Sequence, residues 1–377
     1  MKILVISHEY PPIGGGGGKV VEELSQGLAQ KGHQLHLLTA HYGNLPRVEQ
    51  SDNLTIERLP SWRSEPFRAD LKAMAAFIIK SFFRGLKVIR AFKPEVIHAH
   101  FAVPAGAAAF LLAKACGIPY VMTAHGGDVP GGAPEKTAGW FRLALPFSKL
   151  IWKHAAAVAA VSSQTRELAM AHYHAAIRVI PNGIDTEAMK PRDLLVHTPP
   201  RVVFIGRFSP EKNATAVPKI LAKLKDLDWQ CDMLGDGLEM EEVRRLIDEY
   251  GLSGRIRLLG WLEPDGVKGA LAQSDILLMP SYREGMPMAA LQALSMGLAL
   301  LLPNKGSCPE MIRDNGFLVE PGDLDGYTSR LEKLLRDKKR LAEFKENSRR
   351  LSADFDIAKT INAYEQLFQE VLRQEVI

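Results

Sequence analysis

The feature that most constrains the fold is an alternation of short apolar runs with amphipathic stretches. Runs rich in Val, Ile and Leu begin the chain and recur through its first half, and patterns with helical spacing separate them. Short apolar runs of this kind are typical of parallel strands that are buried on both faces. We therefore predict a doubly wound parallel sheet, with strands at 2–7, 34–40, 95–101, 119–125 and 157–162.

The alternation stops and begins again in the second half of the chain. Residues 180–200 are rich in proline and turn-forming residues. Apolar runs resume at 201–207, 230–237, 255–261 and 275–281. The length of 377 residues also suits about two domains. We predict an N-terminal Rossmann-like domain at 1–185, a linker at 186–200, a C-terminal Rossmann-like domain at 201–356, and a final helix at 357–377 that packs back on the first domain.

Composition excludes several classes of protein. The formal net charge of +4 is too small to indicate a nucleic-acid partner. Three cysteines lie far apart without a CxxC pair, so we expect neither a disulfide framework nor a zinc site. The first residues do not read as a signal peptide, and no apolar stretch reaches the length of about 20 residues that spans a bilayer. We expect a cytoplasmic protein that is soluble or peripheral on a membrane.

A glycine run, IGGGGGK at 13–19, lies between the first predicted strand and a helix predicted at 20–33. In open α/β sheets, ligands bind beside the carboxyl ends of the strands. Glycines let the backbone approach a phosphate there, and a helix N-terminus favours anions. The run matches neither GxxxxGK[ST] nor GxGxxG. We predict that Gly15, Gly16 and Gly17 face a phosphate or an acceptor, and a flexible turn is the alternative.

Two loops of the second half carry candidate residues directly after predicted strands. Arg207 and Lys212 lie in GRFSPEKN, and together they could neutralise a diphosphate. Gly235 lies in GDG, where it permits close approach of a backbone. The alternatives are two solvated cations in the first loop and an ordinary turn in the second.

The stretch REGMPMAALQALSMG places polar residues around the start of a predicted helix. Pro287 suits the first turn, so the N–H groups of Met286 and Met288 would lie at a helix N-terminus that can bind phosphate. Glu284 precedes the helix. Gln292 lies inside it, roughly 8 Å beyond Pro287 at ~1.5 Å of rise per residue. Two polar side chains at this spacing could contact different parts of one nucleotide-sugar.

At this point the chain resembles a known family, the retaining GT-B glycosyltransferases of the glycogen-synthase-like and sucrose-synthase-like class. The matching segments occur in family order along nearly the whole chain: PPIGGGGG, KGHQLHLLT, TAHGGD, IPNGID, GRFSPEKN, GDG, EGMPM and NGFLVEPGD. The resemblance implies the GT-B fold, in which two Rossmann-like domains with doubly wound parallel sheets face a central cleft. It also implies a nucleotide-sugar donor, no metal ion and no other cofactor.

The family's Glu-x7-Glu signature falls on Glu284 and Gln292. By resemblance, Glu284 holds hydroxyls of the donor sugar, with Gly285, Met286 and Met288 beside the donor. Gln292 takes the place of the second Glu, which binds the ribose. A carboxylate accepts from both ribose hydroxyls, whereas a Gln amide accepts at one end and donates at the other. We expect weaker but real donor binding, and nothing in the residues explains the preference for Gln.

The resemblance also assigns the remaining candidates. Arg207 and Lys212 are expected to clamp the diphosphate and to stabilise it as the leaving group. His125 is expected near the reacting face of the donor sugar, with Asp128 close behind it. His98 and the histidine two residues later form an HxH pattern that resembles a metal site, but we assign this pattern to a strand.

Residues 71–93 predict a basic amphipathic helix. Its basic residues Lys72, Lys80, Arg84 and Lys87 share one helical face, and its apolar surface comes from Phe77, Phe82, Phe83, Leu86 and Ile89. Such a helix can lie on an anionic membrane surface. The alternative is a core helix with a solvated basic face. Membrane binding would favour a lipid-linked or cell-surface glycan precursor as acceptor, and a place on the inner face of the plasma membrane.

We therefore predict a hexosyltransferase that moves a sugar from a nucleotide-diphosphate sugar to a hydroxyl of a glycan or lipid-linked acceptor, with retention of configuration. A UDP-sugar is favoured as donor, and GDP-mannose is next. Two alternatives stay open. One is a sugar-nucleotide epimerase, which has the same two-domain architecture, and the other is a non-catalytic binding homologue, which only Gln292 favours.

Overall fold

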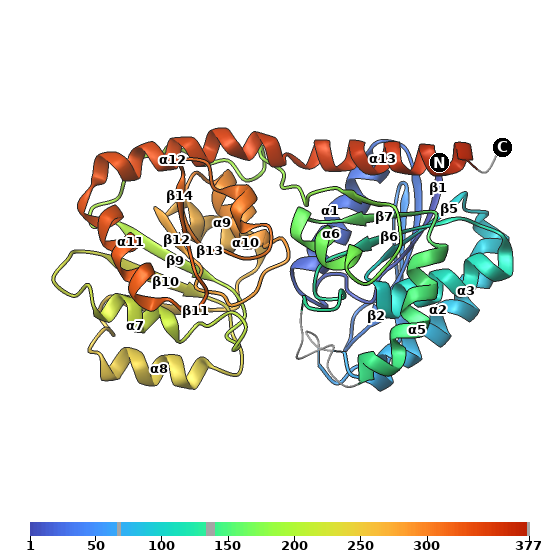
Figure 1. Ribbon diagram of the computed structural model, residues 1–377, viewed down its shortest axis with the longest axis horizontal. Coiled ribbons are helices and arrows are strands. Elements are labelled where there is room, and N and C mark those ends of the chain that lie inside the picture. The colour runs from blue at the N-terminus through green and yellow to red at the C-terminus, as the bar shows by residue number, and fades with distance from the viewer. Residues whose placement is uncertain (66–68, 133–139, 375–377) are drawn as a thin grey trace. The chain divides into compact units, whose positions relative to one another are not determined.

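A computed structural model describes residues 1–65, 69–132 and 140–374 of the chain (Figure 1). The chain forms two compact units. The first unit contains residues 1–183 together with the C-terminal helix from Ile357, and the second unit contains residues 184–356. Each unit has its own sheet, so the predicted fold class of two Rossmann-like parallel-sheet units is confirmed.

The first unit is built on an eight-stranded sheet in the order β3-β4-β2-β1-β5-β6-β7-β8. Its strands are β1 (Lys2–Ile6), β2 (Gln34–His41), β3 (Val48–Ser51), β4 (Leu54–Pro60), β5 (Val96–His100), β6 (Tyr120–Ala124), β7 (Ala157–Ala160) and β8 (Ile177–Val179). Neighbouring strands are parallel, except that β3 runs antiparallel to β4 at the edge.

Helices cover both faces of this sheet (Figure 1). The helices of the first unit are α1 (Gly16–Gln30), α2 (Leu71–Phe92), a π-helical turn η1 (Ala102–Gly106), α3 (Ala107–Cys116), α5 (Trp140–His154), α6 (Ser163–Met170) and α13 (Ile357–Gln374). Alternate residues of β1 enter different cores: Leu4 and Ile6 face one, and Ile3 and Val5 face the other. This double burial explains why the strands read as continuous apolar runs.

The C-terminal helix α13 packs against α1. A side chain at Gly27 would place its Cβ 2.1 Å from Cδ1 of Ile361, so only glycine permits this close approach. At the edge of the contact, the carboxylate of Glu365 accepts from Lys31 and lies 2.9 Å from Nε2 of His33. The last helix of the chain therefore completes the first unit.

The second unit is built on a six-stranded sheet in the order β11-β10-β9-β12-β13-β14, with parallel neighbours throughout. Its strands are β9 (Arg201–Ile205), β10 (Gln230–Leu234), β11 (Ile256–Gly260), β12 (Ile276–Leu278), β13 (Ala299–Pro303) and β14 (Gly316–Val319). Its helices are α7 (Ala216–Ala222), α8 (Met240–Glu249), α9 (Pro264–Ala272), α10 (Met288–Ser295), α11 (Leu324–Arg336) and α12 (Lys338–Ser352), with short 3-10 turns η2 (Cys308–Met311) and η3 (Ala353–Phe355).

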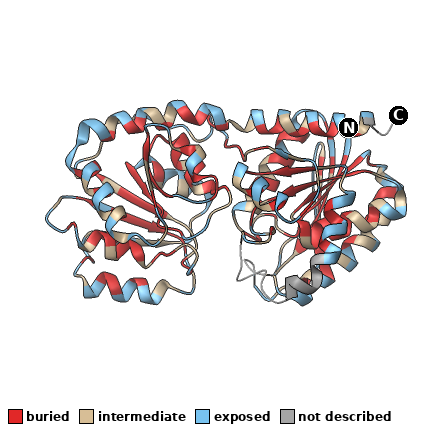
Figure 2. Cartoon of the chain, viewed as in Figure 1, coloured by how far each residue is buried: buried red, intermediate tan, exposed pale blue. Residues whose placement is uncertain are grey.

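Burial follows the same pattern in each unit. The central strands are buried, and the helices expose mainly their outer faces (Figure 2). The core of the second unit contains the large side chains of Phe204, Phe208, Trp229 and Tyr327. Among the described residues, none of the helices has the length and apolarity needed to cross a lipid bilayer.

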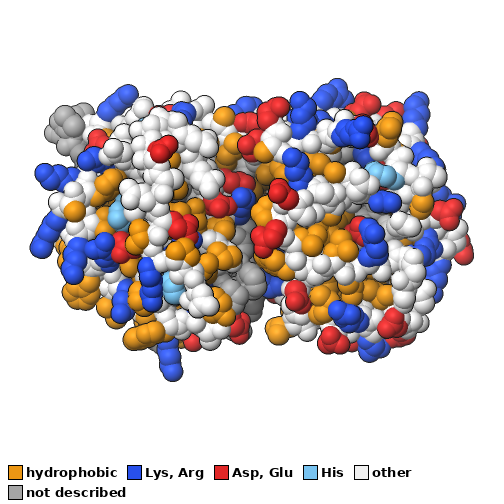
Figure 3. Space-filling view, turned by 180° about the vertical axis from the view of Figure 1, so that it is seen from behind, with side chains coloured by type: hydrophobic (Ala, Val, Ile, Leu, Met, Phe, Trp, Pro, Cys, Tyr) orange, Lys and Arg blue, Asp and Glu red, His pale blue; other side chains and the backbone are white. Residues whose placement is uncertain are grey.

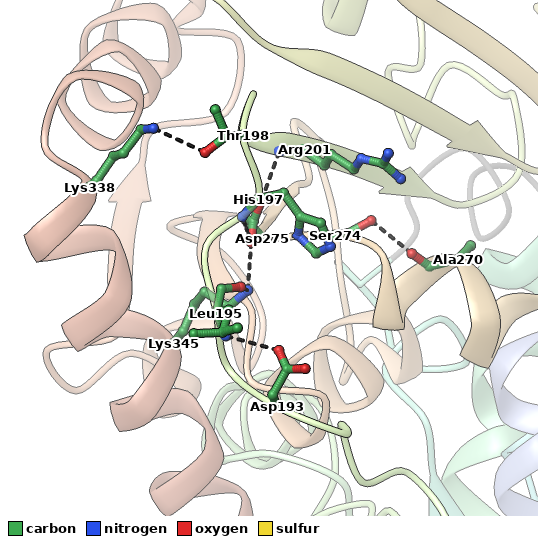
Figure 4. Close-up of polar contacts among 10 residues, drawn as sticks. All are labelled: Asp193, Leu195, His197, Thr198, Arg201, Ala270, Ser274, Asp275, Lys338 and Lys345. Carbon is green, nitrogen blue, oxygen red and sulfur yellow. Dashed lines mark hydrogen bonds and ion pairs between the residues drawn. The ribbon is translucent and has the colours of Figure 1, made fainter.

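The segment predicted as a linker, 186–200, is fixed to the second unit by the buried carboxylate of Asp275 (Figure 4). Asp275 accepts from the backbone N–H of Arg201 at 2.9 Å and from Nζ of Lys345 at 2.6 Å. The backbone N–H and Nδ1 of His197 lie 3.3 and 3.1 Å from the same carboxylate. Because this carboxylate has no contact with water, its charge needs these partners, which hold the segment in place.

Candidate functional site

Two of the predicted catalytic residues form an ion pair in the second unit. Lys212 lies in the loop after β9, and Glu284 lies in the loop between β12 and α10. Nζ of Lys212 is 2.8 Å from Oε1 and 2.7 Å from Oε2 of Glu284. The side chain of Glu284 is only 4% exposed and that of Lys212 is 29% exposed. A carboxylate so deeply buried needs a positive partner, and the lysine supplies it.

Backbone contacts hold these two loops together. The N–H of Tyr282 donates to the carbonyl of Glu211 at 2.9 Å. The side-chain amide of Asn213 donates to the carbonyl of Pro280 at 3.2 Å. Asn213 has a left-handed backbone with φ of 54°, a conformation that Asn tolerates better than most residues. The position of Lys212 opposite Glu284 therefore follows from the local fold of both loops.

Residues beyond β13 support Glu284 from a third segment. Gly306 has φ of 63°, and a Cβ there would lie 2.0 Å from the carbonyl oxygen of Glu284. The N–H of Ser307 donates to the carbonyl of Gly285 at 2.9 Å. Burial, and to a smaller extent the negative charge of Glu284, raises the pKa of the Cys308 thiol well above its usual value. Cys308 was not among the predicted site residues, because a single cysteine far from any other matches no motif.

Helix α10 begins at Met288, directly after Pro287. Met286 and Met288 are buried. Within the helix, Leu291 and Ala293 are fully buried, whereas Gln292 between them is partly exposed. The polar residue in the apolar run therefore lies on the one side of the helix that is open, in the same segment as Glu284.

Glycines pack the loops after β9 and β10 against each other. Gly235 has φ of 129°, and a Cβ there would lie 1.9 Å from the carbonyl oxygen of Gly206. Gly237 has φ of 153°, and its Cβ would lie 2.4 Å from the carbonyl oxygen of Phe208. Gly235 was expected to permit the close approach of a backbone, and the backbone that approaches it is that of Gly206 in the same chain. Half-buried Arg207 lies in the loop that these glycines hold.

A pocket opens beside these loops, at the carboxyl ends of β10 and β11. Its volume is about 600 Å³. It is lined in part by Asp236, Gly237, Leu238, Arg244, Leu258 and Gly260. Most of these residues were not predicted, because backbone and aliphatic groups in a pocket leave no motif in a sequence. In the structure, Leu238 stands out among the lining residues, since it is a large apolar residue that is 93% exposed.

In the first unit, His125 and Asp128 follow β6. Oδ1 of Asp128 accepts from the N–H of His125 at 2.9 Å, and Oδ2 accepts from the N–H of Ala102 at 2.8 Å. Burial raises the pKa of Asp128, while these backbone hydrogen bonds act to lower it. Both carboxylate oxygens are thus used to join the loop after β6 to the turn after β5. Asp128 positions His125.

The His125 ring is enclosed by other rings. It stacks on His100 with centroids 5.3 Å apart, and it lies 4.4 Å from the centroid of Phe101. Burial lowers its pKa to about 4, with smaller opposing effects from Glu9, which raises it, and His8, which lowers it. His125 is therefore a neutral imidazole at pH 7.

The glycine run differs from the expected loop, because α1 already begins at Gly16 rather than at residue 20. A Cβ at Gly14 would lie 2.6 Å from Cβ of Glu9, and one at Gly17 would lie 2.6 Å from the Phe101 ring. Oε2 of Glu9 accepts from the N–H of Gly15 at 3.3 Å. These glycines make room for Glu9 and Phe101, and the helix N-terminus faces a carboxylate of the chain itself.

Glu9 was missed by the sequence reasoning, although it stands at a favoured position directly after β1. Its side chain is 19% exposed. Nε2 of His8 lies 3.9 Å from Oε1 of Glu9, and Arg63 also interacts electrostatically with Glu9. The pKa of His8 is lowered to about 3 by burial and by Arg63, so this histidine is uncharged at pH 7.

The family of the chain follows from comparison with known proteins. Residues 14–188 match the family model "Glycosyltransferase Family 4", and residues 185–351 match "Glycosyl transferases group 1". The chain belongs to the group 1 glycosyltransferases. The glycosyltransferase is 25% identical over 394 aligned positions to N-acetyl-alpha-D-glucosaminyl L-malate synthase of Bacillus anthracis, with 100% of this chain and 99% of the relative covered.

Two further similarities agree with this assignment. The glycosyltransferase is 25% identical to UDP-Gal:alpha-D-GlcNAc-diphosphoundecaprenol alpha-1,3-galactosyltransferase of Escherichia coli, over 78% of this chain and 80% of the relative. Its fold matches sucrose-phosphate synthase of Thermosynechococcus elongatus with a TM-score of 0.86 at 21% identity, over 99% of this chain and 100% of that one. The predicted GT-B fold is thereby confirmed.

Proposed function

We propose that this glycosyltransferase moves a sugar from a nucleotide-diphosphate sugar to an acceptor hydroxyl with retention of configuration. The observation that carries the proposal is the Lys212–Glu284 pair at the carboxyl edge of the second sheet. A buried carboxylate suits sugar hydroxyls, which donate hydrogen bonds, and a lysine suits phosphate. When a donor binds, the two side chains can exchange their mutual contact for these ligands.

In the proposed reaction, the bond between the anomeric carbon and the diphosphate oxygen breaks, and its electron pair stays with the diphosphate. Arg207 and Lys212 stabilise the charge that develops there. The acceptor oxygen bonds to the same carbon from the same face, through an oxocarbenium-like state. The acceptor's proton passes to the leaving phosphate. We assign no side-chain base and require no metal ion.

We assign the base of the nucleotide to the pocket beside β10 and β11. Its volume of about 600 Å³ lies within the range of roughly 300–1,000 Å³ that is usual for small-molecule sites. Gln292, on the open side of α10, is assigned to the ribose. We favour UDP over GDP, in agreement with the UDP-galactose in the name of the E. coli relative.

We assign the acceptor to the first unit and propose that α2 docks on anionic lipid. The helix carries five basic and no acidic residues. Ile79 is 56% exposed and Phe83 is 62% exposed, and exposed Lys80 and Lys87 lie on the same side of the helix. Figure 3 shows basic and hydrophobic side chains intermixed on the surface of the first unit. Exposed apolar groups among cations suit a membrane interface.

Two apolar residues that were predicted for this surface lie in the core instead. Phe77 and Ile89 are buried in the core of the first unit, so they add no apolar surface. Nε of Arg84 donates to Oε1 of Glu57 at 2.6 Å, which neutralises part of its charge. The surface that remains is smaller than the sequence predicts. It suits a peripheral contact that would bring a lipid-linked glycan acceptor within reach.

Vesicle flotation tests this membrane proposal. Replacing Ile79 and Phe83 together by Ser should weaken binding to phosphatidylserine-containing vesicles roughly tenfold, because it removes the inserted apolar groups. A control replaces Met170 and Leu195, which are 52% and 74% exposed, by Ser. Equal binding of parent, test variant and control, or equal binding to neutral vesicles, would argue that α2 is only a solvated helix.

The donor proposal is tested by thermal stabilisation with UDP, GDP and ADP at millimolar concentration. A ligand that binds only the folded protein raises Tm according to its occupancy. One nucleotide should stabilise the parent protein, and Arg207→Ala should lose most of this shift. If no nucleotide raises Tm, the non-catalytic alternative takes precedence. Conversion of the donor sugar without an acceptor would instead identify an epimerase.

A further inference from the structure

Two buried histidines of β5, His98 and His100, have no part in the proposed reaction. Both side chains are completely buried, and their ring centroids lie 4.2 Å apart. Nδ1 of His100 lies 3.1 Å from Nε2 of His125. The HxH pattern that resembled a metal site therefore touches the candidate site residue directly, through one nitrogen of each ring.

The contact continues from His98 to the C-terminal helix. Nε2 of His98 lies 2.8 Å from Oγ1 of Thr123, and this hydroxyl lies 2.9 Å from the hydroxyl of Tyr364 on α13. Tyr364 and Phe368 also pack on the His98 ring, with both centroids 5.2 Å away. The residues form a continuous buried row from α13 to His125, so the rings have little freedom to turn.

All three histidines of the row are uncharged at pH 7. Burial lowers the pKa of His98 to about 3 and that of His125 to about 4, and it holds the pKa of His100 well below its usual value. A hydrogen bond between two neutral imidazoles needs one N–H and one bare nitrogen. The 3.1 Å contact between His100 and His125 therefore contains one proton, which belongs to one ring or to the other.

The other nitrogen of His100 decides between the two cases. Nε2 of His100 is buried and has no hydrogen-bond partner among the described residues. If His125 donated, His100 would carry its proton on Nε2 and leave a buried N–H without an acceptor. If His100 donates through Nδ1, only a bare nitrogen is left without a partner. Orphaned buried N–H groups are rarer than under-used acceptors, so the second arrangement is favoured.

We propose that His100 is a positioning residue that fixes His125 in the tautomer with its proton on Nδ1. The ring nitrogen of His125 that is not held by His100 is then a neutral hydrogen-bond donor. Such a group can donate to an oxygen of the sugar but cannot accept a proton there. Its use in catalysis rests on the proposed function, whereas the tautomer itself does not.

Nitrogen-15 NMR of histidine-labelled protein without substrate tests the proposal, because protonated and bare ring nitrogens have separate shifts. A His125→Gln variant assigns the signals. In the parent protein, Nδ1 of His125 should carry the proton. His100→Asn keeps an N–H donor close to the position of Nδ1 and should preserve this tautomer, whereas His100→Leu should give a mixture of both. A proton on Nε2 in the parent, or an unchanged tautomer in His100→Leu, would overturn the proposal.

Kinetics then separates this inference from the function of the site. We expect kcat to fall roughly 10- to 100-fold in His100→Leu and to be largely restored in His100→Asn. Misplacing a group in an active site reduces the rate by a factor of this order. A shifted tautomer without loss of kcat would leave the positioning role of His100 intact and would contradict the role of His125 in the reaction. If His100→Leu does not fold, the parent spectrum and His100→Asn still decide.

Discussion

The carboxyl edges of the two sheets have similar architecture but place different charged side chains after their central strands. In each unit a glycine-containing loop follows a central strand, β1 in the first unit and β9 in the second. The loop after β1 holds the carboxylate of Glu9 at the start of α1, beside histidines that are uncharged at pH 7. The loop after β9 presents Arg207 and Lys212. One topology can therefore serve different substrates, because the side chains after the strands set the local charge.

This contrast supports our proposal that the diphosphate binds to the second unit. A phosphate at the N-terminus of α1 would meet the Glu9 carboxylate, and like charges at short distance repel. At the second edge a phosphate would instead meet Arg207 and Lys212, if Lys212 exchanges its contact with Glu284 for the phosphate. The helix N-terminus alone is not sufficient for an anion site when the chain already places a carboxylate there.

The largest effect is expected from Lys212→Ala. Transfer should fall roughly 10³-fold, because the leaving group loses a cation that acts in the transition state. The variant should also lose up to about 3 kcal/mol of stability, since Glu284 stays buried without its partner, and the partial exposure of Lys212 limits the loss. Steady-state kinetics and urea unfolding measure the two effects.

A double variant separates stability from catalysis. Lys212→Met with Glu284→Leu removes both charges together, and should regain most of the stability without regaining activity. Full transfer activity in either variant would show that the second edge does not handle the leaving group.

Acid should affect the two units differently. Ten of the eleven histidines lie in the first unit, and His197 is the exception. Burial lowers the pKa of His8 and His98 to about 3 and that of His125 to about 4 from 6.5. Below pH 6.5 the unfolded chain binds protons that these folded residues do not. Their contribution to stability is complete above pH 6.5 and is lost as the pH falls toward about 3.

Hydrogen exchange with mass spectrometry measures this difference peptide by peptide. At about pH 5, protection factors should fall more for β5 and β6 than for β9 and β12, relative to pH 7. A control variant, His98→Leu, tests the cause without adding a titrating group. Equal losses in both units would mean that carboxylates rather than histidines control the response.

The smallest effect is expected from Gln292→Glu. A carboxylate can accept from both ribose hydroxyls, so donor affinity should rise by roughly threefold to tenfold, with little change in kcat. Isothermal titration with the stabilising nucleotide measures this change. Gln292→Ala provides the reference without a polar group. Unchanged affinity in both variants would place the ribose away from α10.

Periodicity predicted the central strands of both sheets, because these strands are buried on both faces and read as apolar runs. It missed five of the described strands, β3, β4, β8, β13 and β14. In β4 polar residues alternate with apolar ones, and β13 continues the apolar run of α10. Only the turn at Gly297, with φ of 69°, separates that strand from the helix. Local patterns identify an element well only when its environment is uniform.

The site residues that follow strands were visible in the sequence, since position after a strand is itself the signal. Their contacts were not. Lys212 pairs with Glu284 across a separation of 72 positions in the sequence. Asp128 accepts hydrogen bonds from two backbone N–H groups only because the loop after β6 packs against the turn after β5. Glu9 was not predicted, because a single carboxylate beside a glycine run matches no motif.

The contact of α13 with α1 has a consequence for the order in which the protein can form. The second unit is inserted between two parts of the first, since the chain leaves the first unit after residue 183 and returns to it at residue 357. During synthesis, β1 to β8 emerge long before the helix that covers one side of their sheet. The second unit, whose sequence is continuous, can fold as soon as it has left the ribosome. The half of the protein that is made first is therefore the half that is finished last.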